Sequence, residues 1–541
     1  MAKQKKVTGG SGNTSGRNGS NDTNASALTN PAQPGFFEET LVPLVDRIPL
    51  WLRTSICLLL VAIAASCSYV VNKGEPPYPF WDENYHVTSG QRYIDGLGHF
   101  EPHPPLALLL IAAGELLSGE NQNVDKHQLI VDKYINGDKM PPNFSFAGMR
   151  LMPSLFAAFG ALLFFGLLLT LTENRLLALL FSTLYVFENA YVVHFRAVHL
   201  DSIQMFFCLA TIWQFVRLWK RPDTLSWKAY AWLGVLAGLA IMAKINAALL
   251  LILFPILYFK DAATRLDFDL TRLAQDFIAK TGSTIVAILI VVLTIFAIHG
   301  AIGRKLPDPQ SSAGKQDIEN MSPTYKEYLT QHGALTPDVV FAITRDYFKF
   351  MDKDHLGVPK LDICKPGENG SHPLHWLIMD KTINYRWDSA DGKTKYVQLV
   401  GNQVSWYLGL ASLFLSIALI VNHRFFKNPI GNTKTYHLIE VFTSLYATFM
   451  VLHLYLGTQR VMYLYHYFLG LLITYILVVL QYQYLTDLHA LRTKTRMLIA
   501  GGMALAISLS FAFFAPLSNH NPLTKSQCEA RNIFSHIVDC Q

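Results

Sequence analysis

The chain has 541 residues, of which 51% are hydrophobic and only 16% are charged, and its mean hydropathy is +0.25. Because a soluble protein of this size is less apolar, the composition indicates a multi-pass membrane protein. The formal net charge of +6 is modest, and the basic residues lie between apolar segments instead of forming one stripe, which argues against a nucleic-acid-binding protein.

The N-terminal residues differ in composition from the rest of the chain. Residues 1 to about 35 are rich in Gly, Ser, Asn and Thr and begin with the basic run MAKQKK. This pattern predicts a disordered cytoplasmic tail, assigned to residues 1–45, without a cleavable signal peptide. Four regions are expected after it: an N-terminal transmembrane module over 46–302 with a first external loop at 72–146, an external cap loop over 303–403, C-terminal transmembrane helices over 404–515 and an external tail over 516–541.

Apolar segments of near 20 residues, with shorter ones allowed inside a bundle, predict about eleven membrane helices and an all-α integral membrane protein. Residues 229–259 are interpreted as two short helices, because basic loops at both ends require the chain to turn back near Lys244–Asn246. The helices are expected at Trp51–Val71, Phe146–Leu171, Leu176–Val193, Ser202–Trp219, Ala229–Met242, Ala247–Phe259, Thr284–Ile302, Val404–Val421, Leu438–Tyr455, Val461–Leu480 and Met497–Phe514.

Short loops that carry Lys and Arg give the orientation of these helices. The first external loop, residues 303–403 and the C-terminus are expected outside, because the basic segments belong in the cytoplasm. Those segments are the N-terminal tail, Lys220–Lys228, Lys260–Lys280, Asn422–His437 and His489–Arg496.

An adjacent acid pair, Asp82 and Glu83, follows the first apolar segment within PPYPFWDENYH, directly after Trp81. Prolines stiffen the approach, and His103 precedes a proline-initiated helix. Helix capping alone could explain both acids, since Asp82 sits where an N-cap would and Glu83 falls in the first turn. The pair is otherwise a candidate active site at the membrane surface.

Several ionisable residues lie at the outer ends of membrane helices, where an unpaired charge is costly and function is the default hypothesis. Snorkelling or internal ion pairs are the alternative for each of them. Taken together, carboxylates beside Arg, Lys and His suit a reaction that deprotonates a nucleophile and stabilises an anionic leaving group. The set comprises Arg150, Glu188, Arg196, His199, Asp201, Lys244, Arg460 and His466.

The external segment 303–403 has mixed polarity, and we expect a partly helical cap with helices at Tyr325–Gln331 and Pro337–Phe350. The polar run Ser371–Asp388, which contains His372, is either a solvated part of that cap or dips into the membrane interface.

Six cysteines show no CxxC or metal-binding spacing, which argues against a zinc site or a redox dithiol. Cys528 and Cys540 could form a disulfide if the C-terminus faces an oxidising compartment. The chain contains no Walker, GxGxxG or GxSxG motif, which argues against an ATPase, a Rossmann enzyme or a serine hydrolase of the familiar types.

A transferase working outside the cytoplasm has no nucleotide-sugar or ATP pool, so it needs an activated donor carried by the membrane. A polyprenyl-phosphate sugar meets this need. Arg can bind its phosphate leaving group, and a carboxylate is the natural base for an acceptor hydroxyl.

The sequence resembles the protein O-mannosyltransferase family, whose members have the GT-C membrane fold. The matching segments are spread over residues 76–470 and follow one another in the same order as in the family. It rests on the segments PFWDENYH, FEPHPPLALLL, RLMPSLFAAFG, ENAYVVHFRAVHLDSI, LGVLAGLAIMAKINA, SHPLHW, LVGNQVSWY and RVMYLYHY.

The resemblance implies transfer of mannose from a polyprenyl or dolichyl phosphate to Ser or Thr of a translocated protein, with inversion. Asp82 would be the general base, and Glu83, the second catalytic residue, would organise the same loop or the acceptor site. Arg150 would support the donor phosphate or the acid pair, and His372 and Arg460 would bind the donor phosphate. Apart from the resemblance, the residues themselves suggest as candidate substrate contacts Trp81, His103, Glu188, Arg196, Asp201, Lys244 and His466. No metal is expected to bind, no cofactor is certain besides the lipid-linked donor, and a dimer is an open option.

Eukaryotic members of this family insert a β-trefoil MIR domain into the long external loop, whereas residues 303–403 show neither its β pattern nor its length. This departure favours a bacterial-type member in the plasma membrane, with the endoplasmic reticulum membrane as the eukaryotic alternative. It also leaves open a lipid or surface-polysaccharide acceptor. A transporter or lipid flippase would favour paired repeats, and the sequence has no such halves.

Overall fold

The computed structural model describes residues 49–263, 269–533 and 538–540. Thr54–Gln541 form one compact unit, to which the following description applies. The tail predicted over residues 1–45 lies outside the described residues.

The membrane part of the unit is helical, as predicted. Its residues are apolar over long stretches and satisfy their backbone hydrogen bonds within each helix, which the bilayer requires. The helices are α2 (Leu50–Ala65) with its continuation η2 (Ser66–Val70), α6 (Leu151–Thr172), α7 (Arg175–Phe181), α8 (Thr183–Val186), α9 (Asn189–Phe195), α10 (Asp201–Trp219), α11 (Trp227–Ala243), η4 (Ile245–Ile252), α12 (Leu253–Ala263), α13 (Leu270–Ile302), α17 (Gln403–Phe426), α18 (Thr433–Gln459), η6 (Leu464–Tyr467), α19 (Phe468–Leu488) and α20 (Thr493–Ser518).

Among the described residues, eight helices are long and apolar enough to cross a membrane. The bent pair made of Arg175–Val186 and Asn189–Phe195 would be a ninth. Each of the eleven predicted segments contains helix, but α10 and α11 are not among these nine, so the count of eleven stays a prediction. The break predicted near Lys244 is present, since α11 ends at Ala243 and the 3₁₀ turn η4 begins at Ile245.

The single helix predicted at Leu176–Val193 is wrong. The chain bends by 61° between Val186 and Asn189. At this bend the Glu188 carboxylate accepts a hydrogen bond from the backbone N–H of Ala190 and so caps α9.

Helix α19 forms the centre of the bundle. Its apolar stretch is 94% buried, against 22% for α20 and 11% for α2, whose outer faces are therefore left for lipid. Glycine allows close helix approach on the other side of the bundle, since a Cβ atom at Gly234 of α11 would lie only 2.9 Å from the carbonyl oxygen of Thr284 in α13.

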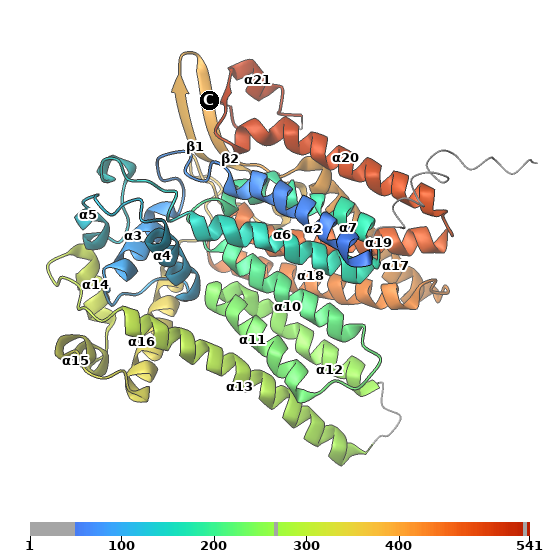
Figure 1. The fold of residues 1–541 in the computed structure, drawn as a ribbon, viewed down its shortest axis with the longest axis horizontal. Coiled ribbons are helices and arrows are strands. Elements are labelled where there is room, and N and C mark those ends of the chain that lie inside the picture. The colour runs from blue at the N-terminus through green and yellow to red at the C-terminus, as the bar shows by residue number, and fades with distance from the viewer. Residues whose placement is uncertain (1–48, 264–268, 534–537, 541) are drawn as a thin grey trace, which may run out of the picture. The chain divides into compact units, whose positions relative to one another are not determined.

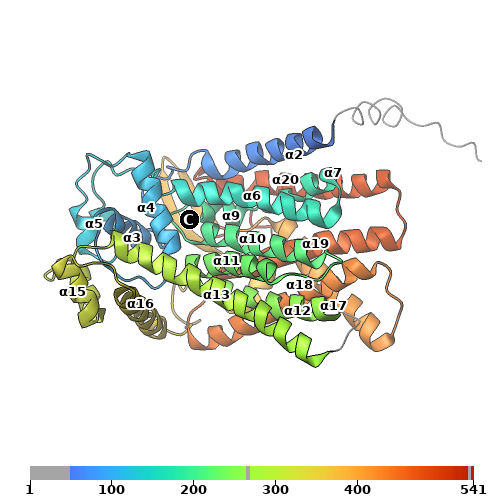
Figure 2. The same ribbon diagram turned by 60° about the horizontal axis from the view of Figure 1, so that its bottom comes forward.

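The remaining elements gather at one end of this bundle, while the basic connections α10–α11, α17–α18 and α19–α20 lie at the other end (Figures 1 and 2). Helices α15 and α16 confirm the two predicted in the cap. The gathered elements are α3 (Glu83–Ile94), α4 (Leu106–Ser118), α5 (His127–Val131), η3 (Gly137–Lys139), α14 (Ser312–Asn320), α15 (Pro323–Gln331), α16 (Pro337–Gly357), η5 (Pro373–Ile378) and α21 (Lys525–Glu529).

A small antiparallel sheet of order β1-β2-β3 completes this end. It consists of β1 (Ile383–Ala390), β2 (Lys393–Leu399) and the short β3 (Pro522–Leu523). The helical cap predicted over residues 303–403 thus also contains a β-hairpin, at residues 383–399, which the sequence analysis did not predict. The hairpin turns at Asp391 and Gly392, both with positive φ, and the pairing register of β1 shifts between Asn384 and Arg386, which makes Tyr385 a bulge.

Candidate active site

Glu83 and Arg150 form a buried ion pair. The Arg150 Nε donates to Glu83 Oε1 at 2.7 Å and Nη2 donates to Oε2 at 2.8 Å. The same carboxylate accepts the backbone N–H groups of Phe80 and Val198. It therefore joins the loop before α3, the start of α6 and the α9–α10 connection at one point.

The remaining donors of Arg150 hold the loop that precedes the acids. Its Nη1 donates to the backbone carbonyls of Lys73, Gly74 and Pro76, and its Nη2 donates to that of Tyr78. All five N–H groups are used inside the protein and the side chain is only 1% exposed. These contacts favour the predicted support of the acid pair by Arg150, and its role at the donor phosphate stays a prediction.

Asp82 is placed differently from its neighbour. It stands at the N-cap position of α3, but its side chain makes no capping hydrogen bond, so the capping explanation fails for this residue. Its carboxylate is half-buried and accepts one long hydrogen bond, 3.4 Å, from the hydroxyl of Tyr465. Asp82 thus keeps a carboxylate that forms no ion pair with any described residue.

The backbone before Asp82 is held in a conformation that a bulky residue rarely adopts. Trp81 has φ of +53°, which costs about 1–3 kcal/mol. Its ring stacks on Tyr385 at 4.9 Å and contacts Tyr463 and Tyr465 edge-on at 5.4 and 6.2 Å. Aromatic packing therefore compensates for the strain and fixes the direction of the next side chain.

A second charged group lies behind Tyr465. Asp201 pairs with Lys244, 2.8 Å from Nζ, and with His194, 3.1 Å from Nε2. Because Asp201 only accepts, His194 donates to it through the Nε2–H, and the Nδ1 of His194 lies within hydrogen-bond distance of the Tyr385 hydroxyl, at 2.8 Å. The ring of Tyr465 stacks on His194 at 4.8 Å and has Lys244 Nζ 5.4 Å from its centroid.

Histidines fill the space between Asp82 and this group. His86 and His199 have ring centroids 5.9 Å apart, and His86 and His103 are 6.4 Å apart. Burial lowers the pKa of His86 and, helped by nearby cationic groups, lowers the pKa of His103 and His199 well below 6.5. These imidazoles are neutral at neutral pH, so they add no positive charge beside Asp82.

Arg460 follows the last residue of α18, and its guanidinium has no bonding partner among the described residues. It is half-buried, its Nε is shielded from solvent without a hydrogen-bond partner, and it forms no ion pair with any described residue. It lies close enough to His355 to lower the pKa of that imidazole, after the larger effect of burial. His372 comes from the adjacent turn η5, where Pro373 packs on Gly457, but its exposed ring caps η5 through the N–H of Leu374.

Three predicted substrate contacts have other partners. Glu188 is fully buried and accepts from Asn402, Ser405 and Tyr475, so it is a structural hydrogen-bonding centre between α9, α17 and α19. Arg196 points to the end of α20, where its Nη1 donates to Asn519 at 2.8 Å. His466 bonds the backbone of Tyr463 and caps η6. These contacts favour positioning roles for Glu188, Arg196 and His466, whose roles as substrate contacts stay predictions.

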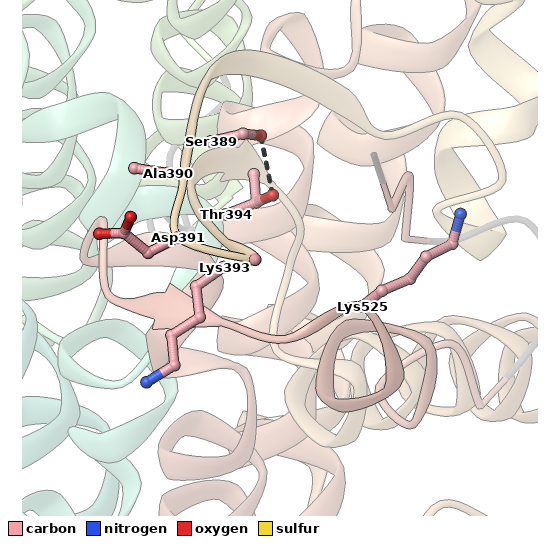
Figure 3. Close-up of a pocket in the computed structure, with 7 residues that line it drawn as sticks. Ser389, Ala390, Asp391, Lys393, Thr394 and Lys525 are labelled. Carbon is pink, nitrogen blue, oxygen red and sulfur yellow. Dashed lines mark hydrogen bonds between the residues drawn. The ribbon is translucent and has the colours of Figure 1, made fainter.

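The open hollow in Figure 3 is not part of this site. It lies at the tip of the β1–β2 hairpin, with Asp391 and Lys393 on one side and Lys525 of α21 on the other. Cys528, in the same helix, is joined to Cys540 by a disulfide. Within the described ranges, no three His, Cys, Asp or Glu side chains are arranged to hold a metal ion.

The sequence reasoning missed four residues of the site: His86, His194, Tyr385 and Tyr465. His194 sits in the apolar segment NAYVVHF, where a histidine was an available signal, and His86 follows the acid pair directly in DENYH. Tyr465 lies 383 positions after Asp82, and only the folded chain brings the two together.

Comparison with known proteins matches most of the chain to one family. The family model described as dolichyl-phosphate-mannose-protein mannosyltransferase matches residues 57–306, and the model of the C-terminal four TMM region of protein-O-mannosyltransferase matches residues 361–537. Among solved structures, the S. cerevisiae protein O-mannosyltransferase Pmt1-Pmt2 complex bound to the sugar donor has a TM-score of 0.72 at 14% identity, covering 92% of this chain and 94% of that chain. This likeness shows the fold, which is the GT-C fold.

Curated relatives are similar over shorter stretches. Protein O-mannosyl-transferase 2 of Danio rerio is 28% identical over 256 residues, which are 45% of this chain and 32% of the relative. Dolichyl-phosphate-mannose--protein mannosyltransferase 3 of Saccharomyces cerevisiae is 27% identical over 177 residues, which are 32% of this chain and 22% of the relative. The chain thus matches a third or less of the length of these relatives.

Proposed function

This chain belongs to the dolichyl-phosphate-mannose-protein mannosyltransferase family, and we propose that it transfers mannose from a polyprenyl or dolichyl phosphate to Ser or Thr hydroxyls of proteins. The observation that carries the proposal is Asp82: a half-buried carboxylate, held next to strained Trp81, that neither caps its helix nor forms an ion pair with any described residue.

In the proposed reaction Asp82 is the general base. It accepts the proton of the acceptor hydroxyl while that oxygen forms a bond to the anomeric carbon of mannose. The bond between this carbon and the phosphate oxygen breaks, and the lipid phosphate leaves with the bonding electron pair. A single displacement of this kind inverts the anomeric centre.

The leaving phosphate needs positive charge, and the site offers two cations of different kinds. Arg460 has a guanidinium without an acidic partner among the described residues, and its planar fork matches a phosphate. Lys244 is shared with Asp201, which leaves it less available. We therefore assign the donor phosphate to Arg460, with Lys244 as a fixed charge that contributes to the local potential.

Glu83 and Arg150 act as positioning residues in this proposal. Their ion pair fixes residues 73–83, the segment that presents Asp82. Trp81 and Tyr385 form the aromatic wall beside the carboxylate, a surface suited to the apolar face of a sugar ring.

The membrane orientation is part of the proposal. All elements of the site lie at the end of the bundle opposite the connections α10–α11 and α19–α20 (Figure 1). These connections carry Lys and Arg, for example Arg221 and Arg492. The positive-inside rule then gives a cytoplasmic N-terminus and an extracytoplasmic site and C-terminus. Whether the host membrane is the bacterial plasma membrane or that of the endoplasmic reticulum follows from the organism.

The experiment incubates purified protein with radiolabelled polyprenyl-phosphate mannose and a panel of Ser- and Thr-containing peptides, and identifies products by mass spectrometry. The proposal predicts one added hexose on a Ser or Thr side chain. If the label enters only added lipid or polysaccharide, the acceptor is of that class and not a protein. If no donor is consumed, the proposed transferase activity is refuted. Light scattering of the same sample tests whether this chain forms a dimer. The Pmt1-Pmt2 complex, in which two chains associate, suggests this arrangement.

A further inference from the structure

The outer edge of strand β1 is unpaired. The sheet order β1-β2-β3 leaves β1 with a neighbour on one side only. Beyond that ladder, residues 383–390 form no backbone hydrogen bond to any described part of the chain. Figure 1 shows the hairpin projecting past the helices. A strand edge of this kind is a template for pairing with another extended chain.

This strand leads from the candidate base to solvent. Its bulged residue Tyr385 is buried and stacks on Trp81, the residue before Asp82. Two positions later Trp387 is 49% exposed, and the strand ends with exposed Ala390. At about 3.3 Å per residue, the strand from Tyr385 to Ala390 covers roughly 17 Å.

Side chains along the strand suit contact with a polypeptide. Both amide atoms of Asn384 are shielded from solvent, and neither has a hydrogen-bond partner among the described residues. An amide in this state is unfavourable unless a ligand satisfies it. A peptide backbone offers both the donor and the acceptor that it lacks, and the exposed indole of Trp387 offers apolar surface for a neighbouring side chain.

We propose that the acceptor polypeptide binds as an added strand along the outer edge of β1, so that one of its Ser or Thr hydroxyls reaches Asp82. The inference rests on the proposed function, because it states how the acceptor of that reaction is held. Because this recognition uses the backbone, acceptors with many different side chains can bind, provided that the segment is extended. A residue without a backbone N–H, such as proline, should not bind at the positions that donate to β1.

A backbone N-methyl scan tests the pairing in the unmodified enzyme. A good acceptor peptide is made in versions that each carry one N-methyl group at successive residues around the Ser or Thr. Because alternate residues of a strand face the same edge, the KM of transfer should rise about threefold to tenfold at every second position and stay unchanged between them. The KM for the lipid donor should be constant throughout.

A matched pair of protein variants gives an independent readout. Asn384→Leu should raise the KM for the peptide without changing the KM for the donor, whereas Lys393→Ala at the exposed hairpin tip should change neither. If wild type transfers mannose equally well to all N-methylated peptides, the strand pairing is wrong and the proposed function stands. If wild type modifies no peptide at all, the proposed function fails and this inference fails with it.

Discussion

Glu83 and Arg150, 67 positions apart, meet in two parallel hydrogen bonds of 2.7 and 2.8 Å inside the protein. The two residues that look most alike in the sequence, Asp82 and Glu83, thereby receive opposite roles. The Glu83 carboxylate is fully buried and paired, so it fixes the loop, whereas Asp82 remains accessible for chemistry.

Arg150→Lys should destabilise the protein by about 3–5 kcal/mol and abolish most transfer activity. A lysine ammonium has three donors and cannot reproduce the two-pronged contact with Glu83 together with the backbone carbonyls. Thermal unfolding in detergent measures the loss. The control is Arg424→Lys, whose solvent-exposed contact with Glu440 should leave the melting temperature close to that of wild type. Equal effects of the two variants would contradict the role of Arg150.

The Asp201–Lys244 pair should show strong energetic coupling. Lys244→Met and Asp201→Asn each leave a buried partner uncompensated, so the double variant should be more stable than the sum of the single losses predicts, by about 1–3 kcal/mol. A double-mutant cycle by thermal unfolding measures this term. The same cycle on the exposed pair Lys220 and Glu173 should give less than about 1 kcal/mol. Additive losses at Asp201 and Lys244 would show that the pair is not buried as described.

Glu101 should make the free energy of unfolding decrease as the pH is raised from about 4.5 to about 7. Burial raises the pKa of this carboxyl to about 7, although Lys133 and Arg92 lie nearby. In this window the folded protein holds a proton that the unfolded chain has lost, so the free energy of unfolding decreases as the pH rises and levels off above about 7. The total change is at most about 3 kcal/mol.

Glu101→Gln should remove that part of the pH dependence, which melting temperatures across the window would report. The exposed Glu319→Gln should keep the wild-type profile. An unchanged slope in the Glu101 variant would mean that the carboxyl ionises at its ordinary pH.

The cysteine pairing gives a test of the proposed orientation. Cys528 and Cys540 are linked, whereas Cys57, Cys67, Cys208 and Cys364 are free. Protein made in its own host and denatured without reductant should therefore take up four maleimide labels, and six after reduction. Six labels without reductant would place the C-terminus in a reducing compartment.

The sequence allowed prediction of the features that depend on local pattern. Apolar length located the helical segments, and the motif around Asp82 indicated the family. Glu188 could not be assigned from the sequence, because an acidic residue in an apolar segment indicates a functional role as well as a structural one. The hydrogen bonds from Ser405 and Tyr475 favour the structural role. The Asp391–Gly392 turn between β-branched and aromatic residues was a readable hairpin signal that was overlooked.

Contacts across long chain separations could not be predicted in this way. His194 and Tyr385 are 191 positions apart, and their hydrogen bond depends on a β-bulge and on the bend that ends α8. Neither feature leaves a repeating pattern in the residues that it joins. The unused state of Arg460 is likewise a property of the packed end of the bundle.

The most direct measurement compares single-turnover mannose transfer by Asp82→Asn and by Asp138→Asn, an exposed acid of the same external loop. Loss of the general base should slow transfer by about 10²- to 10⁴-fold in the first variant, with binding of the lipid-linked donor within threefold of wild type and no change in the second. An Asp82→Asn protein that binds donor normally and retains more than about a tenth of the wild-type rate would contradict the assignment of Asp82 as the base.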